Sequence, residues 1–434
     1  MPTLTFPLSR IEGHAQVTIS YTEGQVRSAH FQATELRGFE YFCQGAPAEQ
    51  MPVIVPRICG VCSTAHHIAA VKALEDICSI SPSPIATRIR ELMMLGQLVQ
   101  NQATSLFMFT LPDLGGGGGV PSLFHLGEAE ADIPAKALAV RRLGTELITM
   151  AGGQFIHPVR AVVGGVSAGL SRAASEAMHS RVTEVLPVAI DLLERYWELF
   201  EQLCQRIGTL GDDQPTHGIG AIRQGHAFYG GPIVVLDAET RERISFEACE
   251  YEQFLEQVPI ETSYSSATQF RGAPMHANSL ARLNLVQKPG TPIADRYANR
   301  FWDTWSWPAY AILLYDIARG LELVYSLERA QSILEEDLSH DEFVAQGCDL
   351  VDGEGYGLVE APRGPLIHHY RIEKGRVREA RFVIPTQHNI LAIERALEVA
   401  ARRYIDKDHI STELEHAVGR VVRAFDPCIA CATH

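Results

Sequence analysis

Two short cysteine motifs lie near the opposite ends of this chain of 434 residues. The first contains Cys59 and Cys62, and the second contains Cys428 and Cys431. Each C-x-x-C pair offers two thiolates from one tight turn, and four such thiolates favour a soft or borderline metal such as Ni, Fe, Zn or Cu(I). If both pairs bind one metal centre, the fold must bring distant parts of the chain to a single buried site.

A structural zinc site with four thiolate ligands is one interpretation of these motifs. Zinc ribbons and knuckles, however, usually bring their cysteine pairs together over tens of residues. Most of the chain lies between the two pairs here. The zinc interpretation therefore stays open, but the long separation makes it less favoured than a different metal centre that both pairs share.

The composition is that of a globular protein, with 46% hydrophobic and 21% charged residues. Acidic residues outnumber basic ones by 52 to 37, which gives a formal charge of −15. This balance argues against nucleic acid or an anionic membrane as the main partner. The first residues lack the basic and apolar regions of a signal peptide, and no stretch has the roughly 18 apolar residues of a membrane span. We expect a cytoplasmic protein with no direct membrane span.

Local patterns predict hairpins near both ends and helices between them. Alternating residues at 15–21 and 26–34, and at 366–370 and 377–384, predict two hairpins that turn at Glu23-Gly24 and Lys374-Gly375. The five glycines at 115–119 predict a loop, and residues 211–300 predict an irregular, partly β insertion. Apolar residues at helical spacing predict helices over 65–77, 84–110, 181–207, 302–334, 389–404 and 412–425.

Six segments of the sequence, taken in order, resemble the large, catalytic subunit of [NiFe]-hydrogenases, most closely the cytoplasmic bidirectional group. They extend from one end of the chain to the other, which makes the joint resemblance specific. One departure is Ala430, which stands between the second pair of cysteines where relatives often carry Ser. The segments are RIEGH (10–14), ELRGFE (35–40), RICGVCSTAH (57–66), EAPRG (360–364), IPTQHN (384–389) and DPCIACATH (426–434).

The resemblance implies an α/β (α+β) fold in which a long-helix bundle forms the core and β-hairpins lie near both termini. We expect a single large-subunit domain over residues 1–434. Within it we distinguish an N-terminal hairpin region, a helical body, the partly β insertion, and a C-terminal helical and hairpin region. Their expected ranges are 1–56, 57–210, 211–300 and 301–434.

The resemblance also implies how the four cysteines act. All four would bind Ni, and Cys62 and Cys431 would in addition bridge to an Fe that carries CO and cyanide. A bridging thiolate is chemically reasonable because one sulfur can share its charge between two soft metals. Cys59 and Cys428 would then be terminal ligands of Ni.

Two further residues would act on these cysteines. Heterolytic cleavage of H2 releases a proton, and Glu12 would accept it from a terminal cysteine. Without the motif around it, Glu12 would be interpreted as an ordinary surface residue before a strand. His66 would orient a cysteine through a hydrogen bond.

The late motifs would surround the open side of the metals. Arg363 would point at the open metal position and, with Pro362, line the pocket of the diatomic ligands. Because a guanidinium does not give up its proton readily, electrostatic positioning is the better role for it. Thr386, which follows Pro385, would donate a hydrogen bond to a cyanide nitrogen. Asp426 would pair with Arg363 or a neighbouring group, or cap the turn that follows it.

A second, hard-metal site is implied as well. Glu40, the terminal His434 and the backbone carbonyl near Phe382 would bind Mg, or Fe in its place. Carboxylate and carbonyl oxygens are the usual ligands of such hard cations. This site would hold the C-terminal segment over the active centre.

Electrons released at this site need a partner protein that accepts them. Once the four cysteines are used, the remaining ones are isolated in the sequence and form no iron–sulfur motif. We therefore expect a hydrogenase small subunit with iron–sulfur clusters, and NAD(P)-, deazaflavin- or heterodisulfide-linked electron-transfer subunits beyond it. Two alternatives are an H2-sensing relative with the same ligands and a quinone-binding oxidoreductase subunit of the same fold. Subunits of the second kind lack the cysteines, so the presence of all four here argues directly against it.

Overall fold

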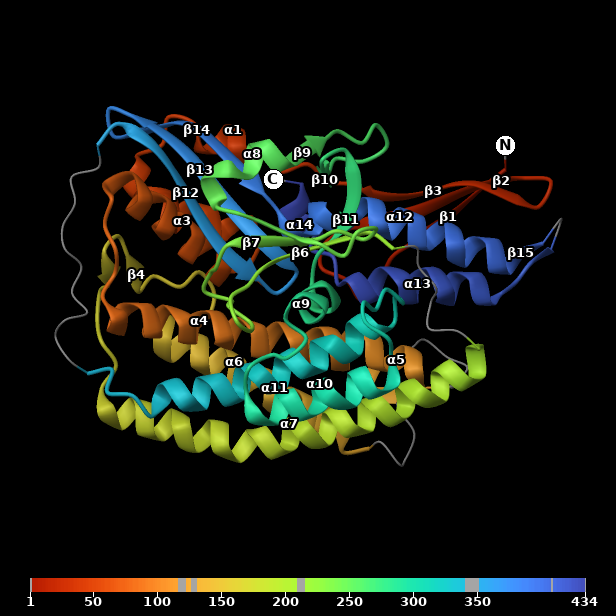
Figure 1. The fold of residues 1–434 in the computed structure, drawn as a ribbon, viewed down its shortest axis with the longest axis horizontal. Coiled ribbons are helices and arrows are strands. Elements are labelled where there is room, and N and C mark those ends of the chain that lie inside the picture. Colours follow the sequence, from red (N-terminus) through yellow and green to blue (C-terminus); the bar gives the residue numbers. More distant parts are fainter. Residues whose placement is uncertain are drawn as a thin grey trace.

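The computed structural model describes residues 2–115, 122–125, 131–208, 215–339, 351–406 and 409–433. A layer of mostly long helices forms the lower half of the molecule as drawn in Figure 1, and the larger sheets lie in the upper half together with further helices. The helices are α1 (Phe39–Cys43), α2 (Met51–Ile54), α3 (Ser63–Cys78), α4 (Pro84–Ala103), α5 (Leu111–Leu114), α6 (Ile133–Gly152), α7 (Arg172–Ile207), α8 (Tyr251–Phe254), α9 (Ser279–Val286), α10 (Pro292–Thr304), α11 (Leu314–Leu334), α12 (Pro385–Tyr404), α13 (Glu413–Phe425) and α14 (Ile429–Ala432).

The bundle consists of α4, α6, α7 and α11, which pack side by side. Helix α4 begins where the sequence predicts, because the side chain of Ser83 accepts a hydrogen bond from the Ala86 N–H at 3.1 Å and Pro84 occupies the first helical position. A π-helical stretch, Thr104–Thr110, continues it towards α5. The C-terminal half of α4 is buried on all sides, and this half faces the site described below.

Three sheets of three or more strands cover the upper half. The first has the order β1-β2-β3 and the last β12-β13-β14, and both are antiparallel. The six-stranded sheet has the order β8-β7-β6-β11-β10-β9 and contains one parallel pair, β6 with β11. The strands are β1 (Thr3–Pro7), β2 (Ala15–Thr22), β3 (Gln25–Ala33), β4 (Ala161–Val162), β5 (Gly165–Val166), β6 (His217–Ala221), β7 (Ile233–Leu236), β8 (Arg243–Phe246), β9 (Leu255–Val258), β10 (Ala267–Phe270), β11 (Ala273–His276), β12 (Gly353–Ala361), β13 (Gly364–Glu373), β14 (Arg376–Val383), β15 (Ile405–Asp406) and β16 (His409–Ile410).

This architecture confirms the predicted fold class, a helix bundle with hairpins near both ends. The two predicted hairpins correspond to β2–β3 and β13–β14. Each is joined by a third strand that the sequence analysis did not predict, β1 in one case and β12 in the other. The reason for the second omission is composition, because β12 is rich in glycine.

The glycines of β12 are required for close packing against α3. A Cβ atom at Gly357 would lie 1.9 Å from the carbonyl oxygen of Ala69, so only glycine fits there. The contact sets β12 directly on α3. It thereby brings the loop between β12 and β13 close to the cysteine turn that precedes α3.

One helix prediction was wrong. Residues 302–334 form two helices, because α10 ends at Thr304 and α11 begins at Leu314. Pro308 lies between them and cannot donate a helical hydrogen bond. Helix α6 was not predicted, and α7 begins at Arg172, earlier than expected.

The predicted insertion at 211–300 contains the six-stranded sheet and α9, so its described part is more regular than expected. Of the predicted glycine loop, residues 116–119 lie outside the described residues. Within the described part of the chain, no helix is both long and apolar enough to cross a lipid bilayer.

Candidate metal centre

The two cysteine turns meet in the interior of the protein. Cys62 precedes the first residue of α3, and Cys428 precedes the first residue of α14. All four cysteine side chains are buried, and their sulfur atoms lie within 4.8 Å of one another. The shorter sulfur–sulfur distances are 2.8 Å for Cys62–Cys431, 2.9 Å for Cys428–Cys431, 3.4 Å for Cys59–Cys428 and 4.0 Å for Cys62–Cys428.

This donor set fits a soft cation. Burial raises the pKa of Cys428 and of Cys431 well above the usual range of a thiol. Four thiolates in such a pocket would repel one another unless a cation neutralised them. The four sulfurs are the donors that would hold such a soft metal ion. The start of α3 also favours negative charge at Cys62, which directly precedes it.

The N-terminal loop lies directly on the second cysteine turn. The Ile429 N–H donates to the backbone oxygen of Glu12, and the Ala430 N–H donates to its carboxylate, both at 3.1 Å. The carboxylate also lies 3.1 Å from the sulfur of Cys428. Burial, followed by the charge of Cys59, raises the pKa of Glu12. A carboxyl that holds a proton more strongly than usual therefore touches one of the four sulfurs.

Gly13 permits this close approach. Its φ of +83° belongs to the region that favours glycine, and a Cβ atom there would lie 2.7 Å from the Cβ of Ile429. The loop is held further by Asp113, which forms ion pairs with Arg10 at 2.5 Å and with Arg423 at 2.7 Å. One buried carboxylate thus joins the segments that carry Glu12 and the second cysteine pair, a link the sequence analysis missed.

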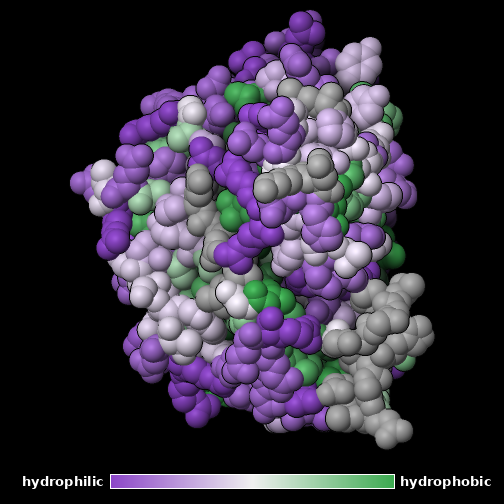
Figure 2. Space-filling view, turned by 90° about the vertical axis from the view of Figure 1, so that its right-hand side faces the viewer, coloured by the Kyte–Doolittle hydropathy of each residue, from purple (hydrophilic) through white to green (hydrophobic). Residues whose placement is uncertain are grey.

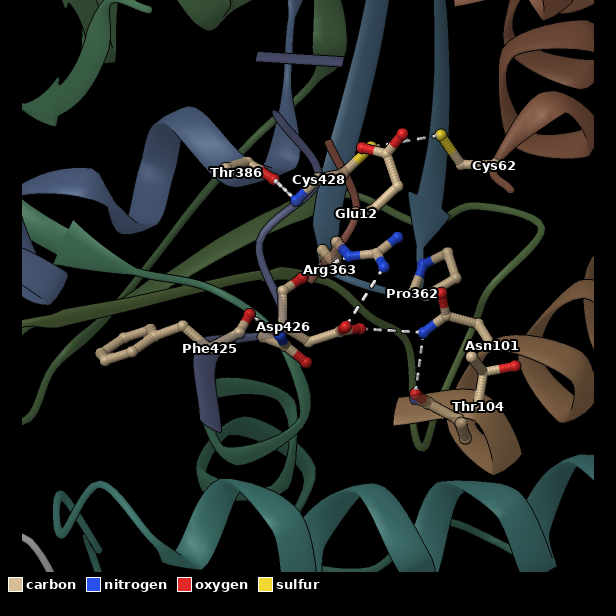
Figure 3. A network of polar contacts seen from close by, with 12 residues as sticks. Glu12, Cys62, Asn101, Thr104, Pro362, Arg363, Thr386, Phe425, Asp426 and Cys428 are labelled. Atoms are coloured by element: carbon tan, nitrogen blue, oxygen red, sulfur yellow. Dashed lines mark hydrogen bonds and ion pairs between the residues drawn. The ribbon is translucent and has the colours of Figure 1, made fainter. Parts of the chain in front are cut away.

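Arg363 and Asp426 form a buried ion pair beside the sulfurs (Figure 3). The Nη2 of Arg363 lies 3.2 Å from Oδ1 of Asp426, and its Nε donates to the backbone oxygen of the same residue. Asn101 on α4 donates to the other carboxylate oxygen at 3.0 Å. Burial alone would lower the pKa of Arg363, but Asp426 and the nearby thiolates raise it above its usual range. The guanidinium therefore stays charged.

A second buried arginine, Arg282, supports the loop between β12 and β13 that carries Arg363. Arg282 donates to the carbonyl oxygen of Pro362 at 2.7 Å, and it forms ion pairs with Glu322 and Glu360, both at 2.6 Å. Gln102 donates to Glu322 at 2.6 Å, next to Asn101. Glu360 and Pro362 belong to the EAPRG motif, but nothing in the sequence pattern marks Arg282 as their partner.

A small cavity of about 20 Å³ lies against the sulfurs. Such a volume holds about one water-sized group. Thr386 accepts a hydrogen bond from the Cys428 N–H at 3.0 Å, so its hydroxyl hydrogen can be donated to a group in the cavity. The lining residues are Cys62, His66, Ala361, Pro362, Arg363, Leu366, Ile384, Pro385, Thr386, Cys428 and Cys431.

His66 lies between a sulfur and a second histidine. Its Nε2 is 3.5 Å from the sulfur of Cys431, and its Nδ1 is 3.0 Å from Nε2 of His368. The sequence analysis did not single out His368, because two adjacent histidines in a predicted strand carry no ligand-like spacing. The neighbouring His67 contacts the Pro52 carbonyl at 2.8 Å.

Two residues of the expected hard-metal site, Glu40 and Phe382, lie together. The Phe382 N–H donates to the carboxylate of Glu40 at 2.8 Å, and the Phe382 carbonyl accepts from Gln257 at 3.1 Å. The Arg37 N–H donates to the Thr433 carbonyl at 2.8 Å, which brings the end of the described chain to the same segment. His434 lies outside the described residues.

The fold and the site together define the class of a nickel–iron hydrogenase catalytic subunit. The family described as nickel-dependent hydrogenase matches residues 37–113 and 224–434, and the family described as HoxL-like matches residues 6–36. The chain therefore belongs to the nickel-dependent hydrogenases, in which it is a catalytic large subunit. This membership replaces structural zinc as the interpretation of the four cysteines.

Relatives match almost the whole chain. A vhu subunit of the F420-non-reducing hydrogenase of Methanocaldococcus jannaschii is 33% identical and aligns over 91% of this chain and 97% of its own length. The NAD-reducing hydrogenase HoxS subunit beta of Cupriavidus necator is 28% identical, with 99% and 93% covered. The solved structure of an NAD⁺-reducing [NiFe]-hydrogenase in its H2-reduced state is similar with a TM-score of 0.92 at 29% identity, and all of both chains is covered.

Proposed function

We propose that Cys59, Cys62, Cys428 and Cys431 hold a Ni–Fe centre, with Cys62 and Cys431 as bridges between the two metals. The bound metals would polarise H2 and make its heterolytic cleavage to protons and electrons possible at neutral pH. The convergence of four buried sulfurs within 4.8 Å is the observation that carries this proposal.

Glu12 would accept the proton from the sulfur of Cys428. Its carboxylate contacts that sulfur, and the Ala430 N–H holds it in place. A carboxyl with a raised pKa suits a group that must both accept and release a proton near neutral pH.

Arg363 would hold a fixed positive charge beside the position where H2 reacts. Asp426 and Asn101 orient the guanidinium, and Arg282 holds the carbonyl of Pro362 next to it. A preorganised charge of this kind stabilises developing negative charge without reorganisation.

The residues that line the small cavity would face the CO and cyanide ligands of the iron. Pro362 and Pro385 supply apolar walls, and Thr386 offers a hydroxyl that can donate to a cyanide nitrogen. His66 would orient Cys431 on the other side of the same cavity.

Glu40, the carbonyl of Phe382 and His434 would form the second site, for Mg or Fe. Glu40 lies within hydrogen-bond distance of the Phe382 backbone. Oxygen ligands of this kind suit a hard cation. With a metal bound, Gln257, which now donates to the Phe382 carbonyl, would have to share that oxygen.

Electrons would leave to an iron–sulfur small subunit, and the surface around the Cys59 turn suits such a partner. The His157 N–H contacts the Ser63 hydroxyl at 3.4 Å, and Arg37 donates to the Ile58 carbonyl, so two outer loops border this turn. They and the helix before the turn expose apolar side chains, which are typical of docking surfaces: Leu36, Val53, Ile156 and Val159.

Another end of the molecule has a mainly polar surface. The end of the molecule that lies to the right in Figure 1 is mainly hydrophilic, and its hydrophobic residues form separate small areas (Figure 2). The coloured part of that end therefore shows no continuous apolar face, and we place the partner at the Cys59 turn. NAD(P)-, deazaflavin- or heterodisulfide-linked subunits would follow the small subunit, in a cytoplasmic complex of the bidirectional group.

Purification of the tagged protein from its native cells tests these proposals. We expect Ni together with an excess of Fe, because the clusters of a co-purified iron–sulfur protein add iron, and infrared bands of CO and cyanide. Zn alone would refute the metal proposal. Bound Ni and Fe with very slow H2 turnover would instead favour an H2-sensing role.

A further inference from the structure

His368 and Tyr370 extend a line of hydrogen bonds outward from the sulfur of Cys431. Nε2 of His368 lies 3.0 Å from Nδ1 of His66, and its own Nδ1 lies 2.7 Å from the hydroxyl of Tyr370. His66 completes the line with Nε2 3.5 Å from the sulfur. All four side chains are buried, so the bonds are protected from water.

The donors in this line can point in only one direction when the sulfur is a thiolate. A thiolate accepts and cannot donate, so Nε2 of His66 must carry its hydrogen. Nδ1 of a neutral His66 then accepts, which requires a hydrogen on Nε2 of His368. Nδ1 of His368 accepts in turn, and the phenol of Tyr370 supplies that hydrogen.

We propose that His368 and Tyr370 are positioning residues that fix the tautomer of His66 and thereby keep its N–H on the sulfur of Cys431. This inference rests on the proposed role of Cys431 as a bridging ligand. A hydrogen bond to a ligating sulfur draws electron density away from the metals, so the line adjusts how strongly Cys431 donates to them.

Packing holds the line in place. His368 and Tyr370 lie two residues apart on β13, so they face the same side of the sheet. The ring of His368 packs against the ring of Phe382, with 4.7 Å between the centroids. A ring fixed on one face in this way keeps both nitrogens aligned with their partners.

The same strand offers a matched control on its other face. His369 follows His368 directly, and its Nδ1 lies 3.2 Å from the hydroxyl of Tyr251. Its Nε2 lies 2.6 Å from Glu354, away from the sulfurs. Tyr251 and His369 thus form a second tyrosine–histidine pair, which is hydrogen-bonded to Glu354.

The test is the infrared spectrum of the CO ligand in the purified, nickel-loaded complex. His368→Leu removes the donor to His66, and Tyr370→Phe removes only the outer hydroxyl. We expect both to shift the CO band to lower wavenumber, because a more electron-rich sulfur increases donation to the iron. His368→Gln, whose amide can donate in place of Nε2–H, is expected to keep the band near its original position. Tyr251→Phe is expected to leave it unchanged.

Unshifted CO bands in both His368→Leu and Tyr370→Phe, with nickel retained, would overturn the inference. If His368→Leu fails to load nickel, Tyr370→Phe decides alone, because it deletes one oxygen atom. An equal shift in Tyr251→Phe would also overturn it, since the effect would then belong to the sheet as a whole. A wild-type complex without any CO band would refute the proposed diatomic ligands instead.

Discussion

Replacement of Glu12 by Gln is the most direct test of the proton path. The amide oxygen of Gln can still accept the hydrogen bond from the Ala430 N–H, so the loop should keep its position on the cysteine turn. The amide nitrogen, however, cannot accept a proton from the sulfur of Cys428, which the carboxylate contacts at 3.1 Å. The change therefore removes proton transfer and retains the surrounding hydrogen bonds.

General acid–base catalysis by one positioned group contributes about 10²- to 10⁴-fold to a rate. We expect H2 oxidation with a viologen dye to fall by this factor, which corresponds to about 3–5 kcal/mol in the barrier. Exchange of D2 with water protons should fall in parallel, because it requires the same path. Ni and Fe content should remain that of the wild type, since Glu12 is not among the metal ligands.

Glu35→Gln provides the control for this experiment. Glu35 belongs to the neighbouring motif and pairs with His14 at the surface, where both side chains are well exposed. Its change should leave the rate within about twofold of the wild type, because exposed ion pairs contribute little. The reasoning would be refuted if Glu12→Gln, with a full complement of metals, kept both H2 oxidation and D2 exchange near wild-type rates.

Three further predictions concern a metal ligand and two residues that support the site. Cys431→Ala is expected to lose bound Ni and H2 activity together, whereas Cys204→Ala on α7 should keep both; retained Ni in the first variant would contradict the ligand set. Arg282→Met leaves Glu322 and Glu360 buried without their cation, and burial already raises the pKa of Glu360 to about 7. We therefore expect the free energy of unfolding, measured by thermal unfolding, to fall by about 3–5 kcal/mol. Arg88→Met, which breaks two more exposed pairs, with Glu91 and Glu336, should cost less than about 1 kcal/mol. Equal losses in the two variants would contradict the supporting role of Arg282. Gly13→Ala should lower the free energy of unfolding through a strained φ, about 1–2 kcal/mol, and through an overlap with Ile429, about 1–3 kcal/mol more. Gly38→Ala, with φ +64° and open space around it, should show only the loss from the strained φ.

The helix and strand predictions succeeded where local pattern decides structure. The Ser83-Pro84 start of α4 and the Glu23-Gly24 turn of the first hairpin are examples, since each depends on residues a few positions apart. They failed where tertiary contacts decide. Strand β12 exists because its glycines fit against α3. The division of residues 302–334 into two helices has a local cause instead, because Pro308 interrupts the helix although the apolar spacing continues.

The sequence by itself determined the chemistry of this protein. Two C-x-x-C pairs specify four soft donors, and the motifs around Glu12, Arg363 and Thr386 indicate which groups accompany them. Only the tertiary structure decided how these groups meet and what supports them. Arg282, Asp113, His368 and Tyr370 act on the site through contacts between segments far apart in the sequence, and their spacing carries no periodic signal. Such partners are selected by burial, because a charge or donor away from water needs a counterpart that only the folded chain supplies.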